Sequence, residues 1–219
     1  MISKITMAIF AALLVGMIAI PMAVYADDGG NTTIKVIPSS IDCNRGEEFS
    51  IEIVVDPDGA EVYGVQYELI FDTTSIECVN QTAGDFLSQD GENSFEIVNR
   101  FNNTIGKVEY GNTRIGVKTG VTSAGTLANI TFRATGDQGS HLELTDVIVS
   151  SPQAEEMPVS VESGVCLVDG KPPRVTAADA AIALEMAVRG EYSVKLDVNG
   201  DSKITSLDAL MILQSAAGT

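Results

Sequence analysis

The sequence predicts a mainly β protein, in which a sandwich of short strands is followed by a small helical module. Between residues 31 and 168, short runs of alternating apolar and polar residues recur with turn signals between them, and helical periodicity is absent. After residue 174 the period changes, and two helical segments repeat at an offset of 29 residues. Many short strands at this spacing favour a β-sandwich of Greek-key or jelly-roll type.

The N-terminal residues 1–26 have the organisation of a secretory signal peptide. Lys4 gives a positively charged start, residues 7–20 form an unbroken apolar run, and Val24 to Ala26 provide small residues for cleavage. The apolar run is also long enough for an uncleaved membrane anchor. We therefore expect a secreted protein, or one held at the cell surface if this segment is retained.

The charge balance is strongly acidic. The chain has 13 basic and 30 acidic residues, a formal charge of −17, and removal of residues 1–26 takes away only Lys4 and leaves −18. Such a chain does not seek phosphate backbones, so nucleic acid is excluded as a partner. The chain has no Trp and only 5% aromatic residues, which weakens the case for sugar stacking.

Ten strands are expected between residues 33 and 168. In the third of them Val65, Tyr67 and Leu69 alternate with Gln66 and Glu68, as expected for a sheet with one buried face. The ten predicted ranges are Thr33–Ile37, Phe49–Val55, Gly64–Phe71, Ser75–Asn80, Ser94–Val98, Lys107–Asn112, Gly125–Ala134, His141–Ile148, Glu156–Val161 and Gly164–Val168.

Residues 197–208 have the spacing of a calcium-binding EF-hand-type loop. Oxygen-bearing side chains stand at positions 1, 3, 5, 9 and 12, which suits a hard cation that takes six to eight oxygen ligands. Position 6 is normally Gly because its backbone needs a positive φ, and here it is Ser202. The alternative is a polar turn without metal. The expected ligands are Asp197, Asn199, Asp201, Lys203 through its carbonyl, Thr205 directly or through a water, and Asp208.

The first copy of the repeat lacks most of these ligands. Val168, Gly170 and Pro172 stand where the second copy has its first three ligands, and only Asp179 survives, so we expect the first copy to bind no calcium. The predicted helices, Ala177–Arg189 and Leu207–Ala217, are apolar almost all the way round. Such surfaces either mark a partner site or are buried between the two helices and the preceding domain.

Loop, repeat and helix pattern together make residues 169–219 resemble a dockerin. That family is built from two calcium-loop-plus-helix units, of which this chain keeps the second nearly intact. The resemblance implies that positions 10 and 11 of each loop contact a partner module. These positions correspond to Ala177 and Ala178 in the first copy and to Ser206 and Leu207 in the second.

The preceding domain resembles a cohesin. The matching segments are R-G-E-E-F-S-I-E-I-V-V (45–55), G-V-Q-Y-E-L-I-F-D-T-T-S-I-E-C-V (64–79), G-T-L-A-N-I-T-F-R-A (125–134) and residues 142–165. The resemblance implies a protein that binds dockerins through the outward face of one sheet. The residues expected on that face are Gln66, Glu68, Glu109 and Asn112.

The domain organisation follows from these boundaries. Residues 1–26 are the signal, 27–168 the cohesin-like sandwich, 169–174 a linker with two prolines, and 175–219 the dockerin-like module. Six linker residues reach at most roughly 20 Å, too short for the helices to swing onto the side of their own sandwich. Head-to-tail pairing between chains remains open and would produce open chains or filaments.

Isolated polar and sulfur residues carry weaker signals. Cys43 and Cys166 could bridge if their strands are neighbours, which would leave Cys78 free, but nothing in the sequence establishes the pairing. His141, the single histidine, is interpreted as a surface turn residue. Four N-x-Ser/Thr acceptor sites for glycosylation occur. They are Asn31, Asn80, Asn102 and Asn129.

Taken together, these patterns predict a non-catalytic assembly or scaffold protein. It would act by calcium-dependent binding to cohesin- or dockerin-bearing proteins, in a system that degrades polysaccharides. The alternative is a carbohydrate-binding sandwich of a surface protein. An enzyme is not expected, because the chain has no Ser/His/Asp set, no paired-carboxylate motif and no cofactor loop.

Overall fold

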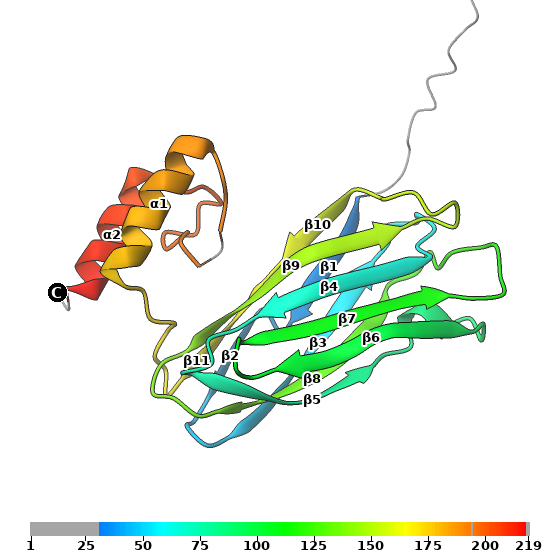
Figure 1. The fold of residues 1–219 in the computed structure, drawn as a ribbon, viewed down its shortest axis with the longest axis horizontal. Helices are drawn as coiled ribbons and strands as arrows, with labels where there is room; N and C mark the ends of the chain where they lie inside the picture. The colour runs from blue at the N-terminus through cyan, green and yellow to red at the C-terminus, as the bar shows by residue number, and fades with distance from the viewer. Residues whose placement is uncertain (1–30, 194, 218–219) are drawn as a thin grey trace, which may run out of the picture.

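The computed structural model describes residues 31–193 and 195–217, over which the chain forms two packed β-sheets and a helix pair (Figure 1). One sheet has five strands in the order β10-β1-β3-β8-β5, and the other has six in the order β2-β11-β9-β4-β7-β6. The elements are β1 (Thr32–Ile37), β2 (Ser40–Cys43), β3 (Glu48–Asp56), β4 (Gly64–Ile70), β5 (Ile76–Ala83), β6 (Ser94–Asn102), β7 (Lys107–Arg114), β8 (Gly125–Ala134), β9 (Ser140–Ser150), β10 (Val159–Glu162), β11 (Gly164–Val168), α1 (Ala177–Arg189) and α2 (Ser206–Ala216), with a 3-10 turn at Phe86–Ser88. The mainly β sandwich that the sequence predicts is confirmed.

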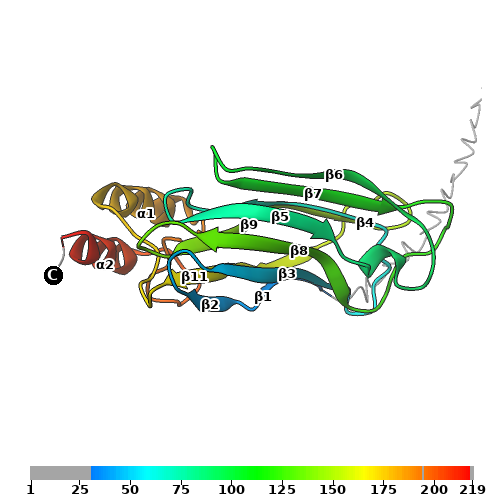
Figure 2. The ribbon, with the colours of Figure 1, turned by 90° about the horizontal axis from the view of Figure 1, so that it is seen from below.

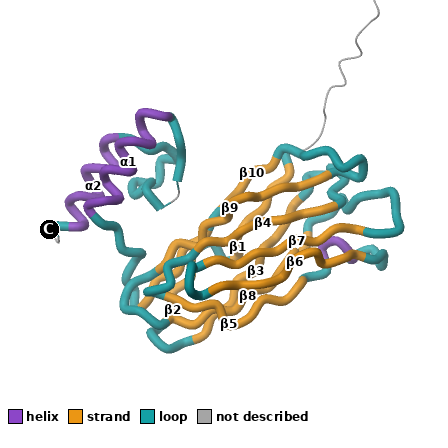
Figure 3. The backbone as a smooth tube through the Cα atoms, viewed as in Figure 1, coloured by secondary structure: helices purple, strands orange, loops and turns teal. Residues whose placement is uncertain are grey.

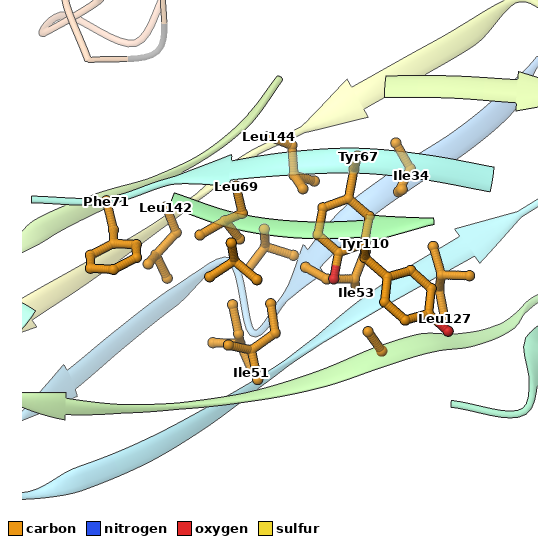
Figure 4. Packing of buried hydrophobic residues seen from close by; sticks show 14 of the residues in the cluster. Ile34, Ile51, Ile53, Tyr67, Leu69, Phe71, Tyr110, Leu127, Leu142 and Leu144 are labelled. Carbon is orange, nitrogen blue, oxygen red and sulfur yellow. The ribbon is translucent and has the colours of Figure 1, made fainter. Parts of the chain in front are cut away.

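The core lies between the inner faces of the two sheets. Alternate residues of each strand point inward because the side-chain period of a strand is two. Ile51 and Ile53 of β3 meet Tyr67 and Leu69 of β4 in this layer, and all four are at most 2% exposed (Figure 4). The inner residues of β4 also face Tyr110 of β7, whose ring stacks on Tyr67 with the ring centroids 5.7 Å apart.

Two local predictions need correction. The four-residue strand β2 was missed, because Ser40–Cys43 is too short to show alternation and is recognisable only through its parallel pairing with β11. His141 is not a surface turn residue but lies half-buried in β9. Burial, together with the nearby Lys195 ammonium, lowers the pKa of His141 to about 4.

Both helices begin with the same capping device. Thr176 caps α1 and Thr205 caps α2, and in each case the Asp three residues later completes a capping box. The two helices pack on each other around a small apolar core of their own, separate from that of the sandwich. This core consists of Ala180, Ala183, Leu196, Ile204, Ala209 and Ile212.

The helix pair stands beyond one end of the sandwich, as Figures 1 and 2 show from two directions and Figure 3 in outline. The connecting segment 169–174 is held against that end. Gly139 N donates to the carbonyls of Lys171 and Pro172 at 3.1 and 3.2 Å, and Gly170 N donates to Asp42 Oδ1 at 3.1 Å. The helical module lies beside His141 of β9 and Val165 of β11, and it leaves the β4, β7 and β6 part of the outer face of the six-stranded sheet uncovered. No helix within the described ranges is long and apolar enough to cross a membrane.

Candidate functional site

The part of the outer face that the helical module leaves open is built by β4, β7, β6 and the Ile148 end of β9. In β4, Gln66 and Glu68 point outward while Val65, Tyr67 and Leu69 point into the core, as the alternation predicts. The register pairs Glu68 with Glu109 of β7, which in turn lies opposite Arg100 of β6. Three of the four residues predicted for this face are therefore brought together on it.

One part of the face is a cluster of ion pairs. Lys107 Nζ lies 2.8 Å from Glu68 Oε1 and 3.2 Å from Glu109 Oε1, and Arg100 Nη2 donates to Glu109 Oε1 at 3.1 Å. The hydrogen bond from Arg100, reinforced by Lys107, lowers the pKa of Glu109 to about 2. The two acids are thus neutralised by two bases on neighbouring positions, and this part of the face carries little net charge.

The adjacent part of the face is a hollow of about 210 Å³, lined by apolar side chains and by the polar residues Gln66, Asn112, Thr113 and Ser150. Ile97 and Ile148 stand at its sides with exposed fractions of 66% and 41%, and Phe95 of the same edge strand is 58% exposed. Gly111 leaves the floor open, since a Cβ there would lie 3.2 Å from Val98 Cγ1. Large apolar side chains exposed together at a recess are typical of a binding surface.

The prediction that Asn112 lies on this outer face is wrong. Asn112 is three residues from Glu109 in the same strand, and residues an odd number apart point to opposite faces of a sheet. Its side chain is buried at 6% exposure, and its Nδ2 lies within hydrogen-bond distance of Ser94 Oγ and Tyr110 Oη, at 3.3 and 3.2 Å. Asn112 therefore helps to order the interior beside the hollow and is not available to a partner.

The helix pair presents a second apolar surface. Leu207, Leu210 and Leu213 of α2 are each about half exposed, at 52, 50 and 45%. On α1, Ile182 and Val188 are exposed to 48 and 89%. The four predicted contact positions all lie on the surface, at the first turns of the two helices; they are Ala177, Ala178, Ser206 and Leu207.

The loop 197–208 is folded around its own carboxylates. Asp197 Oδ1 accepts hydrogen bonds from Gly200 N and Asp201 N, and its Oδ2 accepts one from Ser202 N at 2.8 Å. Ser202 has the positive φ of 62° that position 6 of such a loop demands. Ser202 thus has the backbone conformation expected of the sixth loop position, while the binding of calcium stays a prediction.

Asp208 closes this loop from the first turn of α2. Its Oδ2 accepts from Thr205 N and Thr205 Oγ1 at 2.9 Å, and its Oδ1 accepts from Asn199 N at 3.4 Å. Burial alone would raise the pKa of Asp208, but the hydrogen bonds from Thr205 and Asn199 outweigh it and lower that pKa. Thr205, expected as a ligand, instead uses its hydroxyl to cap the helix.

The loop carboxylates have no basic partner. Asp197, Asp201 and Asp208 form no ion pair with the described residues, although Asp208 is fully buried. No group of three or more His, Cys, Asp or Glu side chains in residues 31–193 and 195–217 is arranged to hold a metal ion.

Comparison with known proteins identifies the larger part of the chain. The family model described as "Cohesin domain" matches residues 34–167, which is more than half of the sequence. The chain belongs to the cohesin family. No curated protein sequence matches it.

Solved structures agree on the fold of this cohesin. The non-cellulosomal cohesin of the archaeon Archaeoglobus fulgidus is 15% identical, with a TM-score of 0.50, covering 64% of this chain and 91% of its own. A cohesin from Clostridium acetobutylicum is 16% identical with a TM-score of 0.54, covering 66% and 95%. The sixth cohesin of scaffoldin B from Acetivibrio cellulolyticus, solved in complex with a dockerin, is 14% identical with a TM-score of 0.52, covering 64% and 100%.

Cohesin domains are non-catalytic modules that bind dockerins, so this cohesin is not an enzyme. The family match ends at residue 167, before the helix pair begins. Sequence reasoning missed Arg100, Lys107 and the exposed Ile97 on the outer face of the sheet. Phe95 and Ile97 alternate with Glu96 and look like core residues, and only the pairing of β6 with β7, with its bulge between Glu96 and Val98, together with their exposure, reveals them as surface.

Proposed function

We propose that this cohesin is an exported assembly protein that binds a dockerin-type helix pair on the outer face of its six-stranded sheet. The observation that carries the proposal is the uncovered hollow beside a charge-neutral cluster of ion pairs. An apolar side chain of a partner helix would enter the hollow between Ile97 and Ile148, and polar partner groups would meet Gln66, Glu68 and Glu109 at its rim.

We further propose that the C-terminal module is a dockerin whose second loop holds one calcium ion. Asp197, Asn199 and Asp201, the carbonyl of Lys203 and the carboxylate of Asp208 are hard oxygen donors of the kind that calcium prefers. The buried, ionised Asp208 has no basic partner among the described residues, and a buried charge needs a counter-charge. Calcium would supply that charge and order the helices that carry the exposed leucines.

In this proposal the helix pair of one chain binds the cohesin face of another chain. The short segment 169–174 is fastened to the end of the sandwich, which argues against a complex within one chain. A second copy of the chain offers a complementary face, so head-to-tail association is the simplest assembly. Such a contact repeats without closing on itself.

The proposed location is outside the cell, in a system that gathers polysaccharide-degrading proteins. It rests on the signal-like residues 1–26, which lie outside the described residues, and on the acidic composition of the remaining chain. In such a system the partner proteins, and not this chain, would bind the polysaccharide.

Sedimentation equilibrium of residues 27–219 with calcium and then with EDTA tests the proposal. We expect association in calcium that reverses on chelation and that is lost on substituting either Ile97 or Leu210 by Asp. A chain that stays monomeric with calcium would refute self-association. Retention of residues 27–219 on insoluble polysaccharide would instead support the carbohydrate-binding alternative.

A further inference from the structure

The two repeats of the C-terminal module place one carboxylate in the same position. In the first repeat Asp179 Oδ2 accepts from Thr176 N and Oγ1 at 2.7 and 2.8 Å, and in the second Asp208 Oδ2 accepts from Thr205 N and Oγ1 at 2.9 Å. Both carboxylates are buried, at 6 and 0% exposure. In each repeat the Oδ2 atom therefore belongs to the helix cap, and the Oδ1 atom is left for another partner.

The partner of that second oxygen differs between the repeats. Lys195 Nζ lies 2.7 Å from Asp179 Oδ1, in the one ion pair that Asp179 forms with the described residues. Asp208 Oδ1 receives the backbone N–H of Asn199, at 3.4 Å. A permanent cationic group thus meets the first carboxylate, while no basic side chain of the described residues forms an ion pair with the second.

We propose that the Lys195 ammonium supplies in the first repeat the positive charge that calcium supplies in the second. The comparison with calcium rests on the proposed function. The first repeat has lost its other oxygen ligands, with Val168, Gly170 and Pro172 in their places, so a metal ion would have little to hold it there. The ammonium of Lys195, just before the second loop, neutralises the buried carboxylate of Asp179 without needing further oxygen ligands.

This arrangement also links the two repeats. Lys195 precedes the calcium-type loop by two residues, while Asp179 lies in the first turn of α1. Their ion pair therefore holds the entrance of the second loop against the first helix. The module would then contain one permanent cation, the Lys195 ammonium, and one exchangeable cation, the calcium ion.

Thermal unfolding of residues 27–219 in saturating calcium tests this role of Lys195. With the helix signal followed by circular dichroism, Lys195→Met should lower the Tm of the helix pair by about 5 °C, because a buried carboxylate loses its counter-charge. Adding Asp179→Asn should recover most of this loss, since an amide needs no counter-charge. Lys171→Met, at an exposed lysine of the connecting segment that forms no ion pair with the described residues, is the matched control.

An unchanged Tm in Lys195→Met, or no recovery in the double variant, would overturn the role of Lys195. Native mass spectrometry of the unaltered chain should show one bound calcium ion. Two ions would also overturn it, because the first repeat would then hold metal. Finding none would refute the proposed calcium site alone, since the recovery by Asp179→Asn is measured independently of it.

A different observation concerns two cysteines at the edge of the sandwich. Cys43 ends β2 and Cys166 lies in β11, and these strands pair in parallel. Their Sγ atoms are 3.6 Å apart, and the side chains are 6 and 0% exposed. The neighbouring strands that a bridge would require are therefore present, and Cys78 lies elsewhere, in β5.

We infer that Cys43 and Cys166 form a disulfide when the chain folds with a disulfide oxidant such as oxidised glutathione. Two S–H bonds are lost and one S–S bond forms, while two electrons and two protons pass to the oxidant and yield two molecules of reduced glutathione. Burial raises the pKa of both thiols, so exchange is slow once the sandwich has folded. The bond would fasten the edge strand β2 next to the segment that leads to the helices.

Alkylation under denaturing conditions, after refolding of residues 27–219 with oxidised glutathione, tests the bond. We expect one alkylated cysteine, Cys78, in place of the three that the reduced chain offers. Cys43→Ala should leave both remaining thiols reactive, and Cys78→Ala should leave none. Three reactive thiols in the unaltered chain, or a bridge that includes Cys78, would overturn the assignment.

Discussion

The substitution Ile97→Asp probes the proposed binding face most directly. Ile97 is 66% exposed, and full burial of an isoleucine side chain stabilises by about 1.5–3 kcal/mol, so a partner that covers it gains about 1–2 kcal/mol. Ile97→Ala should therefore weaken association about 5- to 30-fold. Ile97→Asp also leaves an unpaired carboxylate in the contact, and the loss should exceed about 100-fold.

Sedimentation equilibrium of residues 27–219 in calcium measures this change. The stability of the sandwich should change by no more than about 0.5 kcal/mol in urea, because the side chain makes few contacts within the chain. Ile105→Asp is the matched control, since Ile105 is 60% exposed but lies in the turn beyond the ends of β6 and β7. Equal losses in both variants, or no loss in Ile97→Asp, would refute the assignment of the face.

Three further predictions concern the loop, the calcium and the single histidine. Ser202 has a positive φ of 62°, a conformation that costs a non-Gly residue about 1 kcal/mol. Ser202→Gly should remove this cost and lower the half-saturating calcium concentration about fivefold in a calorimetric titration. An unchanged concentration would contradict this. EDTA should abolish the helical circular dichroism of residues 175–217 and spare the β signal, whereas an unaltered spectrum would exclude calcium-dependent folding. The pKa of His141 is lowered to about 4 by burial, so its contribution to stability is fully present above the unfolded pKa near 6.5 and is lost as the pH falls towards 4. Between pH 7 and pH 5, urea unfolding should show a loss of stability that is about 2 kcal/mol larger in the unaltered protein than in His141→Gln, because the opposing raised pKa of Glu143 acts in both proteins and cancels from the comparison. Equal losses in the two proteins would contradict this.

Much of the fold was predictable because local periodicity and final burial agree. Gly125–Ala134 and Gly164–Val168 begin and end where the alternation predicts, and α1 occupies the predicted residues 177–189. These segments obey simple rules, since a strand buried on one side must alternate and a helix begins at its cap. The spacing of oxygen-bearing side chains in residues 197–208 is local as well, and its interpretation as a calcium loop stays a prediction.

The wrong predictions concern residues whose position depends on pairing between distant strands. The resemblance to cohesins places Asn112 on the outer face, but its separation of three residues from Glu109 puts its side chain on the inner face. His141 was interpreted as a turn residue at the start of the predicted strand His141–Ile148, but β9 begins at Ser140 and pairs His141 with Val165 of β11. In both cases the answer depends on strand register, which a single segment does not contain.

By itself, the sequence determined the class of the fold, the repeat with one intact loop, and the resemblance to cohesins, because periodicity and spacing are properties of neighbouring residues. The tertiary structure alone decided which side chains meet. It brought Arg100 and Lys107 onto Glu68 and Glu109, opened a hollow over Gly111, and joined Lys195 to Asp179. These pairings depend on sheet order and on the docking of one repeat against the other. Each pairing joins residues that lie far apart in the sequence, so its free energy depends on the whole fold and cannot be inferred from a local pattern.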